Sequence, residues 1–128
     1  MNSCTGGHPC RTMLHVSDCR VLVLAGELDT HDARGIAANL SQAVGDTTHT
    51  PVVDARDVTF MDSTVLAALA HASEQLRNQG RGPLTLAAHD GGRVRDLLDQ
   101  SGLAGRFELV SAPPETPRVS KPDPAAAA

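Results

Sequence analysis

The sequence predicts a single α/β domain in which a mixed, mostly parallel sheet of four to five strands packs against three or four helices. Two observations support this fold class, the pattern of the apolar residues and the length of the connections. Short runs rich in valine and leucine alternate along the chain with segments in which apolar residues recur at helical spacing. The connections between them are short, which is typical of right-handed crossovers between parallel strands. The expected order of elements is β-β-α-β-α-β-α-β.

Composition divides the chain into three parts. Residues 1–12 form a polar arm, residues 13–110 carry the periodic patterns, and residues 111–128 hold five of the eight prolines and end in four alanines. The last part has no apolar period that could pack, so we expect a disordered tail. The middle part is long enough to bury a core without disulfides or a metal.

Three strands are predicted in the first half of the chain. Met13–Val16 is expected to be an edge strand followed by a turn. Val21–Ala25 is a continuous apolar run that favours β structure, and we expect a buried strand that stops at Gly26. Pro51–Asp54 has the same character over a shorter length and predicts a second buried strand.

Two amphipathic helices are predicted after these strands. The first is expected over residues 31–44, with Asp29 or Thr30 as its N-cap. The second begins after Asp62 and ends at Gly80. The apolar stripe of the second helix consists of Val65, Leu66, Leu69, Ala72, Ser73 and Leu76.

The remaining elements follow the same alternation. Leu84–Ala87 predicts a third buried strand, and Val94 and Leu98 mark a third helix that ends before Gly102. Phe107–Val110 predicts the last strand. These elements complete the α/β pattern.

Charge and composition exclude several classes of function. Eleven basic and fifteen acidic residues give a net charge of −4, and Phe60 and Phe107 are the only aromatic residues, so a nucleic-acid-binding surface is not expected. The longest apolar run, Val65–Ala70, is far shorter than a membrane span, so no membrane insertion is expected. The N-terminal residues lack the positive start and apolar stretch of a secretory signal, and a cytoplasmic location is therefore expected.

The sequence predicts no metal site and no cofactor. Cys4, His8, Cys10 and Cys19 could in principle gather a zinc ion, but no two of these cysteines are separated by two residues, as in the usual C-x2-C pair. An odd number of cysteines suits reduced thiols better than a disulfide framework. No glycine-rich nucleotide-binding motif and no nucleophile elbow occur, so catalysis is not expected.

The segment Asp62–Thr64 places an acid and two hydroxyls where a buried strand gives way to a helix. The first turn of a helix has unpaired N–H groups and a positive dipole end, so a phosphate on Ser63 would be tolerated there. Asp and Ser are also common N-caps, and the local pattern by itself allows a purely structural role. For Thr64 the more common role is a first-turn hydroxyl bonded to the backbone.

Three segments, in order along the chain, resemble the STAS domain family of bacterial anti-sigma factor antagonists. Gly26–Asp29 is similar to the family's Gly-Glu-Leu/Ile-Asp turn. Asp54–Ser63 is similar to its motif D-L-x-x-V-x-F/Y-I/M-D-S. Leu98–Leu103, followed by Phe107, resembles the family's last helix and the aromatic start of its final strand. Together the matches cover residues 13–110.

This resemblance implies a binding protein controlled by a phosphate. In the family, the serine after the aspartate at the start of the second helix is phosphorylated by an anti-sigma factor that is also a serine kinase. That serine corresponds to Ser63, with Thr64 as a secondary candidate. The unmodified protein would bind the anti-sigma factor and release a sigma factor, and a phosphatase would reverse the modification. The switch requires that the Ser63 hydroxyl be exposed to solvent.

The partner-binding surface is expected at one edge of the sheet, because neighbouring parallel strands end there. Asp29 has two possible roles at this edge, capping the first helix or facing the partner. Val65 and Ala67 stand where the family often has glycine, and a β-branched Val65 is expected to limit the approach of a partner backbone. The predicted partner-binding residues are Asp29, Thr30, His31, Asp62, Ser63, Thr64 and Val65. The alternative function is a non-switching STAS scaffold or an accessory subunit of a signalling or lipid-transport complex.

Overall fold

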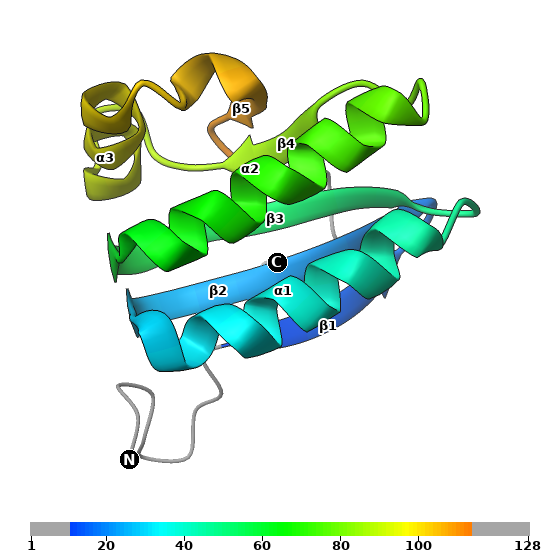
Figure 1. The fold of residues 1–128 in the computed structure, drawn as a ribbon, viewed down its shortest axis with the longest axis horizontal. Helices are drawn as coiled ribbons and strands as arrows, with labels where there is room; N and C mark the ends of the chain where they lie inside the picture. Colours follow the sequence, from blue (N-terminus) through cyan, green and yellow to red (C-terminus); the bar gives the residue numbers. More distant parts are fainter. Residues whose placement is uncertain (1–10, 114–128) are drawn as a thin grey trace, which may run out of the picture.

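Five strands form one sheet in the order β1-β2-β3-β4-β5, with β1 antiparallel to β2 and the other neighbours parallel (Figure 1). The computed structural model describes residues 11–113. The strands are β1 (Arg11–Val16), β2 (Cys19–Leu28), β3 (Thr50–Met61), β4 (Leu84–Ala87) and β5 (Phe107–Val110). The predicted α/β fold class is confirmed.

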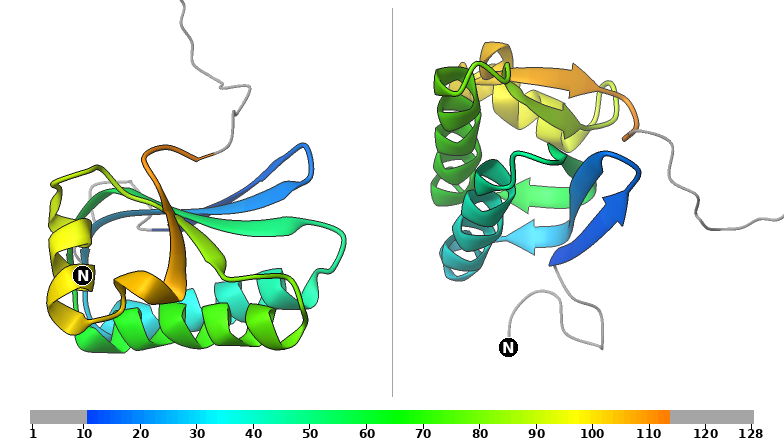
Figure 2. Two further views of the ribbon diagram at one scale, coloured as in Figure 1. Left: turned by 90° about the horizontal axis from the view of Figure 1, so that it is seen from above. Right: turned by 90° about the vertical axis from the view of Figure 1, so that its right-hand side faces the viewer.

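Two long helices cover one face of this sheet. Figure 2 shows α1 (Thr30–Gly45) and α2 (Ser63–Asn78) side by side on that face. The shorter α3 (Arg93–Ser101) packs against β3, and a 3-10 helix, η1 (Ala104–Arg106), leads into β5. The order of strands and α-helices is the predicted one, and η1 is the addition to it.

The main core lies between the sheet and the helices. Side chains alternate between the two faces of a strand, so Leu22 and Leu24 of β2 point to the same side. Ile36 of α1 and Leu69 of α2 pack against them, and both are fully buried. The helical spacing of the apolar residues therefore predicts correctly which side of α1 and α2 faces the sheet.

Three strands are longer than the sequence predicts. β1 begins at Arg11 instead of Met13, and β2 continues through Gly26 to its end at Leu28. Gly26 has a φ of 80° and lies in a stretch of β2 with two register shifts against β3. A bulge of this kind lets a strand stay paired through a glycine with positive φ. The expectation that Gly26 stops the strand is therefore wrong.

β3 shows the largest difference from prediction. It runs for 12 residues to Met61, whereas the apolar run predicts an end at Asp54. Its second half pairs with the extended end of β2, with Gly26 opposite Val58 and Leu28 opposite Met61. Charged residues interrupt the apolar run between residues 54 and 57, and the pairing beyond them depends on the neighbouring strand, so the sequence pattern misses it.

Ser73 links α2 to the elements beside it. Its hydroxyl donates to the carbonyl of Arg106 in η1 at 2.5 Å and accepts from the N–H of Leu84 in β4 at 3.0 Å. Ser73 is buried, so both bonds are shielded from water. The contact fixes the position of η1 against the middle of α2.

Some sequence-based expectations lie outside the described residues. The arm up to residue 10 and the proline-rich tail from residue 114 belong to this group, as do Cys4, His8 and Cys10. Within residues 11–113, none of the helices combines the length and the apolar character needed to cross a membrane.

Candidate functional site

The ends of β2 and β3 bring the starts of two helices together. Leu28 and Met61 are register partners, and the N–H of Asp62 donates to the carbonyl of Leu28 at 3.0 Å. α1 begins immediately after β2, and α2 begins immediately after β3. Asp29 and Asp62 therefore lie at the same edge of the sheet, as predicted.

Asp29 is the N-cap of α1. Its carboxylate accepts from the N–H groups of His31 at 3.0 Å and Asp32 at 3.3 Å. In return, the buried carboxylate of Asp32 accepts from the N–H of Asp29 at 2.9 Å, which completes a capping box. Of the two roles open to Asp29, the structure shows capping.

Thr30 and His31 are exposed at the start of α1. Together with Arg34 they line a shallow hollow on the surface. The Thr30 side chain also donates a hydrogen bond to Asp62 at the start of α2, with 2.9 Å between Thr30 Oγ1 and Asp62 Oδ2. Thr30 thus ties the first turn of one helix to the cap of the other.

Asp62 caps α2 and accepts three hydrogen bonds. Its Oδ1 accepts from the Thr64 backbone N–H at 2.7 Å and from the Thr64 hydroxyl at 2.5 Å, while Oδ2 accepts from Thr30. These bonds, the one from the Thr64 hydroxyl above all, hold the pKa of Asp62 below its ordinary value. The cap is therefore a carboxylate at neutral pH, held on both sides.

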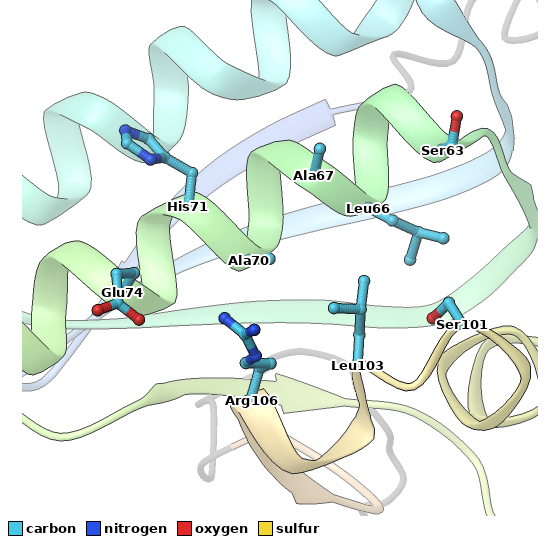
Figure 3. A pocket seen from close by; sticks show the side chains of 9 residues that line it. All are labelled: Ser63, Leu66, Ala67, Ala70, His71, Glu74, Ser101, Leu103 and Arg106. Atoms are coloured by element: carbon cyan, nitrogen blue, oxygen red, sulfur yellow. The ribbon is translucent and has the colours of Figure 1, made fainter.

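Ser63 and Thr64 are both exposed, but their hydroxyls differ. The Thr64 hydroxyl donates to the Asp62 side chain, so the expected bond to the backbone is wrong. The Ser63 hydroxyl makes no hydrogen bond to another residue within 11–113, and Figure 3 shows it pointing away from the side chains of Leu66 and Leu103. The expectation that Ser63 presents its hydroxyl to solvent is confirmed.

Ser63 stands at one end of a shallow groove that the sequence reasoning missed (Figure 3). One wall of the groove is a face of α2, and the opposite wall comes from the end of α3 and from η1. The lining residues are Ser63, Leu66, Ala67, Ala70, His71 and Glu74 on one side and Ser101, Leu103 and Arg106 on the other. The α2 residues recur at intervals of three and four, which is the available sequence signal. The second wall depends on tertiary packing.

Val65 does not reach this surface. Its side chain is 0% exposed and belongs to the core between α2 and the sheet. It therefore cannot contact a partner or limit the approach of a partner backbone, and both expectations are wrong. The physical reason is its helical phase, because Val65 shares the inward face of α2 with Leu69. Ala67, the other departure from the family's glycines, is exposed and lines the groove.

Phe60 is a second surface feature that the sequence reasoning did not single out. It lies near the end of β3, opposite Glu27 of β2, and 45% of it is exposed. Aromatic residues are enriched at protein interfaces, and this one is three residues from Ser63. Its sequence signal is its place in the motif that ends at Ser63.

The described residues offer no metal site. Within 11–113, no three histidine, cysteine or acidic side chains are grouped to hold an ion. Cys19 is a half-buried free thiol at the start of β2, and burial together with the nearby Asp18 raises its pKa. A raised pKa disfavours the thiolate that would bind a metal.

We expect Asp62→Asn to lower stability at neutral pH and to have less effect in acid. The pKa of Asp62 is lower in the folded chain than its ordinary value of 3.8, so folding favours the carboxylate. This contribution is complete above the ordinary value and is lost as the pH falls through the folded-state pKa. Urea unfolding of wild type and of Asp62→Asn between about pH 7 and about pH 2 measures this contribution to stability.

The matched control for this experiment is Asp99→Asn, which removes an exposed carboxylate on α3. Its effect on stability should be small across the whole range. A difference between wild type and Asp62→Asn that stays constant down to the lowest pH would contradict the role assigned to the carboxylate.

Comparisons with known proteins show the family of the chain and its fold. The family model of the STAS domain matches residues 11–115. An anti-sigma factor antagonist from Mycobacterium paratuberculosis is 23% identical, with a TM-score of 0.67 over 77% of this chain and 82% of that chain. The anti-sigma factor antagonist SpoIIAA in its unphosphorylated form is 22% identical, with a TM-score of 0.62 over 80% of this chain and 89% of that chain.

A further solved structure is the Bacillus cell fate determinant SpoIIAA in the phosphorylated form. It is 21% identical, with a TM-score of 0.58 over 78% of this chain and 90% of that chain. Identities at this level show a shared fold. No curated protein sequence matches the chain significantly.

Proposed function

The chain belongs to the STAS domain family, and we propose that it acts as an anti-sigma factor antagonist that is switched off by phosphorylation of Ser63. In the unmodified state it binds an anti-sigma factor with serine kinase activity and so releases a sigma factor. The chain itself performs no catalysis in this scheme. The solved structures with the same fold that are named anti-sigma factor antagonists support the proposal.

The observation that carries the proposal is the Ser63 hydroxyl. It is exposed, it has no hydrogen-bond partner among residues 11–113, and it lies in the first turn of α2. An exposed hydroxyl is open to a kinase. The first turn of a helix also favours negative charge, so a phosphate can be added there without unfolding the helix.

The partner would dock on the surface around this hydroxyl. Thr30 and His31 lie on one side of it at the start of α1, and the groove beside α2 continues on the other side. Both walls of the groove carry apolar side chains, among them Ala67 on the α2 side and Leu103 on the opposite side. An apolar centre with a polar rim is the usual composition of a protein interface.

The switch follows from the charge of the phosphate. Phosphorylation adds about −1.5 to −2 charges beside the Asp62 carboxylate. When a partner covers the surface, this charge must lose water in a region that already holds a negative group. The cost falls on the complex and not on the free protein, so affinity is lost while the fold is kept.

The alternative is a scaffold or accessory subunit that does not switch. A surface valine in place of the family's glycine would favour this alternative, but Val65 is buried in the core and gives it no support. Recovery of permease or ATPase subunits without any anti-sigma factor in a pull-down would favour the alternative.

Phosphate mapping tests the proposal. The chain is incubated with Mg²⁺-ATP and each purified kinase-type anti-sigma factor from the source genome, and mass spectrometry locates the phosphate. We expect phosphate on Ser63, none on Ser63→Ala, and wild-type labelling of Ser41→Ala, a control at an exposed serine of α1 outside the groove. No labelling by any of the kinases, or labelling of Thr64 alone, would contradict the proposal.

A further inference from the structure

Two exposed hydroxyls stand next to each other at the start of α2, so a kinase that docks there meets two candidate acceptors. We propose that the Asp62 carboxylate, held in place by Thr30, selects Ser63 by withholding Thr64 from phosphorylation. This inference rests on the proposed function, since it concerns the choice of acceptor by the same kinase. It assigns Asp62 and Thr30 as specificity-determining residues.

The first step concerns the Thr64 hydroxyl. Its Oγ1 lies 2.5 Å from Oδ1 of Asp62, and the backbone N–H of the same residue donates to the same oxygen at 2.7 Å. The hydroxyl and the N–H are therefore held by one carboxylate oxygen. Phosphorylation would bond Thr64 Oγ1 to the γ-phosphorus of ATP, release ADP and transfer the hydroxyl proton to a base of the kinase. For this, Thr64 must give up a hydrogen bond to a charged acceptor, which is stronger than one to a neutral acceptor.

The second step concerns charge. A phosphoryl group bonded to Thr64 Oγ1 would bring its negative oxygens close to the Asp62 carboxylate, with no donor between them. Like charges at such a distance repel strongly where solvent is partly excluded, as it is in a complex with a kinase. The repulsion acts on the incoming phosphoryl group of ATP as well as on the product. Transfer to Thr64 is therefore disfavoured at both stages.

The third step is the role of Thr30. A carboxylate that could rotate freely would release the Thr64 hydroxyl at little cost. The bond of 2.9 Å from Thr30 Oγ1 to the second oxygen, Oδ2, keeps the other oxygen aimed at Thr64. Thr30 comes from α1, 32 residues away along the chain, so the start of α1 is part of the selection device.

Ser63 lies outside this network. Its hydroxyl makes no hydrogen bond within the described part of the chain, and it points away from the side chains of Leu66 and Leu103 (Figure 3). A phosphate on Ser63 can remain in solvent at the positive end of the helix. The two neighbouring hydroxyls thus differ in their bonding, although both are exposed.

The test is the ratio of phosphate on Thr64 to phosphate on Ser63, measured by mass spectrometry within one sample. The probe is the kinase-type anti-sigma factor that labels the wild-type chain, with Mg²⁺-ATP. In Asp62→Asn the side chain can still cap the helix but carries no charge. We expect the ratio to rise about tenfold or more over wild type, and Thr30→Val to raise it by a smaller factor.

Thr47→Val is the matched control, because Thr47 is an exposed threonine in the loop after α1 and takes no part in the network. Its ratio should equal that of wild type. A readout without the kinase is the ¹³C NMR titration of the Asp62 carboxyl group. Its pKa should rise toward the ordinary value in Thr30→Val and stay unchanged in Thr47→Val.

The outcomes separate this inference from the proposed function. Labelling of wild type on Ser63 with unchanged ratios in Asp62→Asn and Thr30→Val would overturn the selection and leave the proposed switch standing. Loss of all labelling in both variants would show that the network positions Ser63 for the kinase, and would also overturn it. A wild-type chain that no anti-sigma kinase labels would overturn the proposed function and the selection together.

Discussion

Ser63→Asp is expected to weaken binding to the kinase-type anti-sigma factor by between about tenfold and a thousandfold. The substitution places a carboxylate next to that of Asp62, at the surface where the partner docks. Both charges would have to lose water in the complex, and they repel each other. Affinity measured by isothermal titration calorimetry with the purified anti-sigma factor gives the result directly.

Two variants make this experiment specific to charge at that position. Ser63→Ala removes the hydroxyl without adding charge and should bind nearly as tightly as wild type. Ser41→Asp adds the same charge on the exposed side of α1 and should also bind as wild type. Equal affinity of Ser63→Asp and wild type would show that negative charge at residue 63 is not the basis of the switch.

Val65→Gly is expected to lower the free energy of unfolding by about 2.5–4 kcal/mol. The Val65 side chain is fully buried, and removing it loses about 1.5–3 kcal/mol of apolar burial. A glycine inside a helix costs about 1 kcal/mol more. Urea unfolding followed by circular dichroism measures the change.

Ala67→Gly is the natural comparison, since it restores the family's other glycine at an exposed position of the same helix. It should cost only the helix term, about 1 kcal/mol. At temperatures where the Val65→Gly variant is folded, the affinity of that variant for the anti-sigma factor should equal the affinity of wild type. Equal stability losses in the two variants, or a selective loss of affinity in Val65→Gly, would contradict the assignment of Val65 to the core.

Several features of the candidate site were predictable from residues close together in the sequence. The Asp62–Thr64 segment lies where a strand meets a helix, and capping by Asp62 needs only the next two residues. The capping box of α1 is equally local, since Asp29 and Asp32 are three residues apart. The exposure of Ser63 follows from its position as the first residue of α2, outside the apolar stripe of that helix.

Other features of the site were beyond the reach of such patterns. The hydrogen bond between Thr30 and Asp62 joins two helices, and the groove beside Ser63 has its second wall in η1, about forty residues further along the chain. Neither contact leaves a periodic signal. Val65 shows a different error, because its place in the apolar stripe pointed correctly to the core while the family motif suggested a surface role.

The sequence by itself determined the order of the strands and α-helices and the position of the hydroxyl at the start of α2, and it placed an aspartate among the possible caps of both long helices. Each of these depends on forces that act within a few residues, such as side-chain alternation, helical spacing and capping. Only the tertiary structure decided how far β2 and β3 extend, which oxygen of Asp62 holds Thr64, and what lies beside Ser63. These depend on pairing and packing between distant segments, and such contacts form only when the whole sheet and its helices assemble.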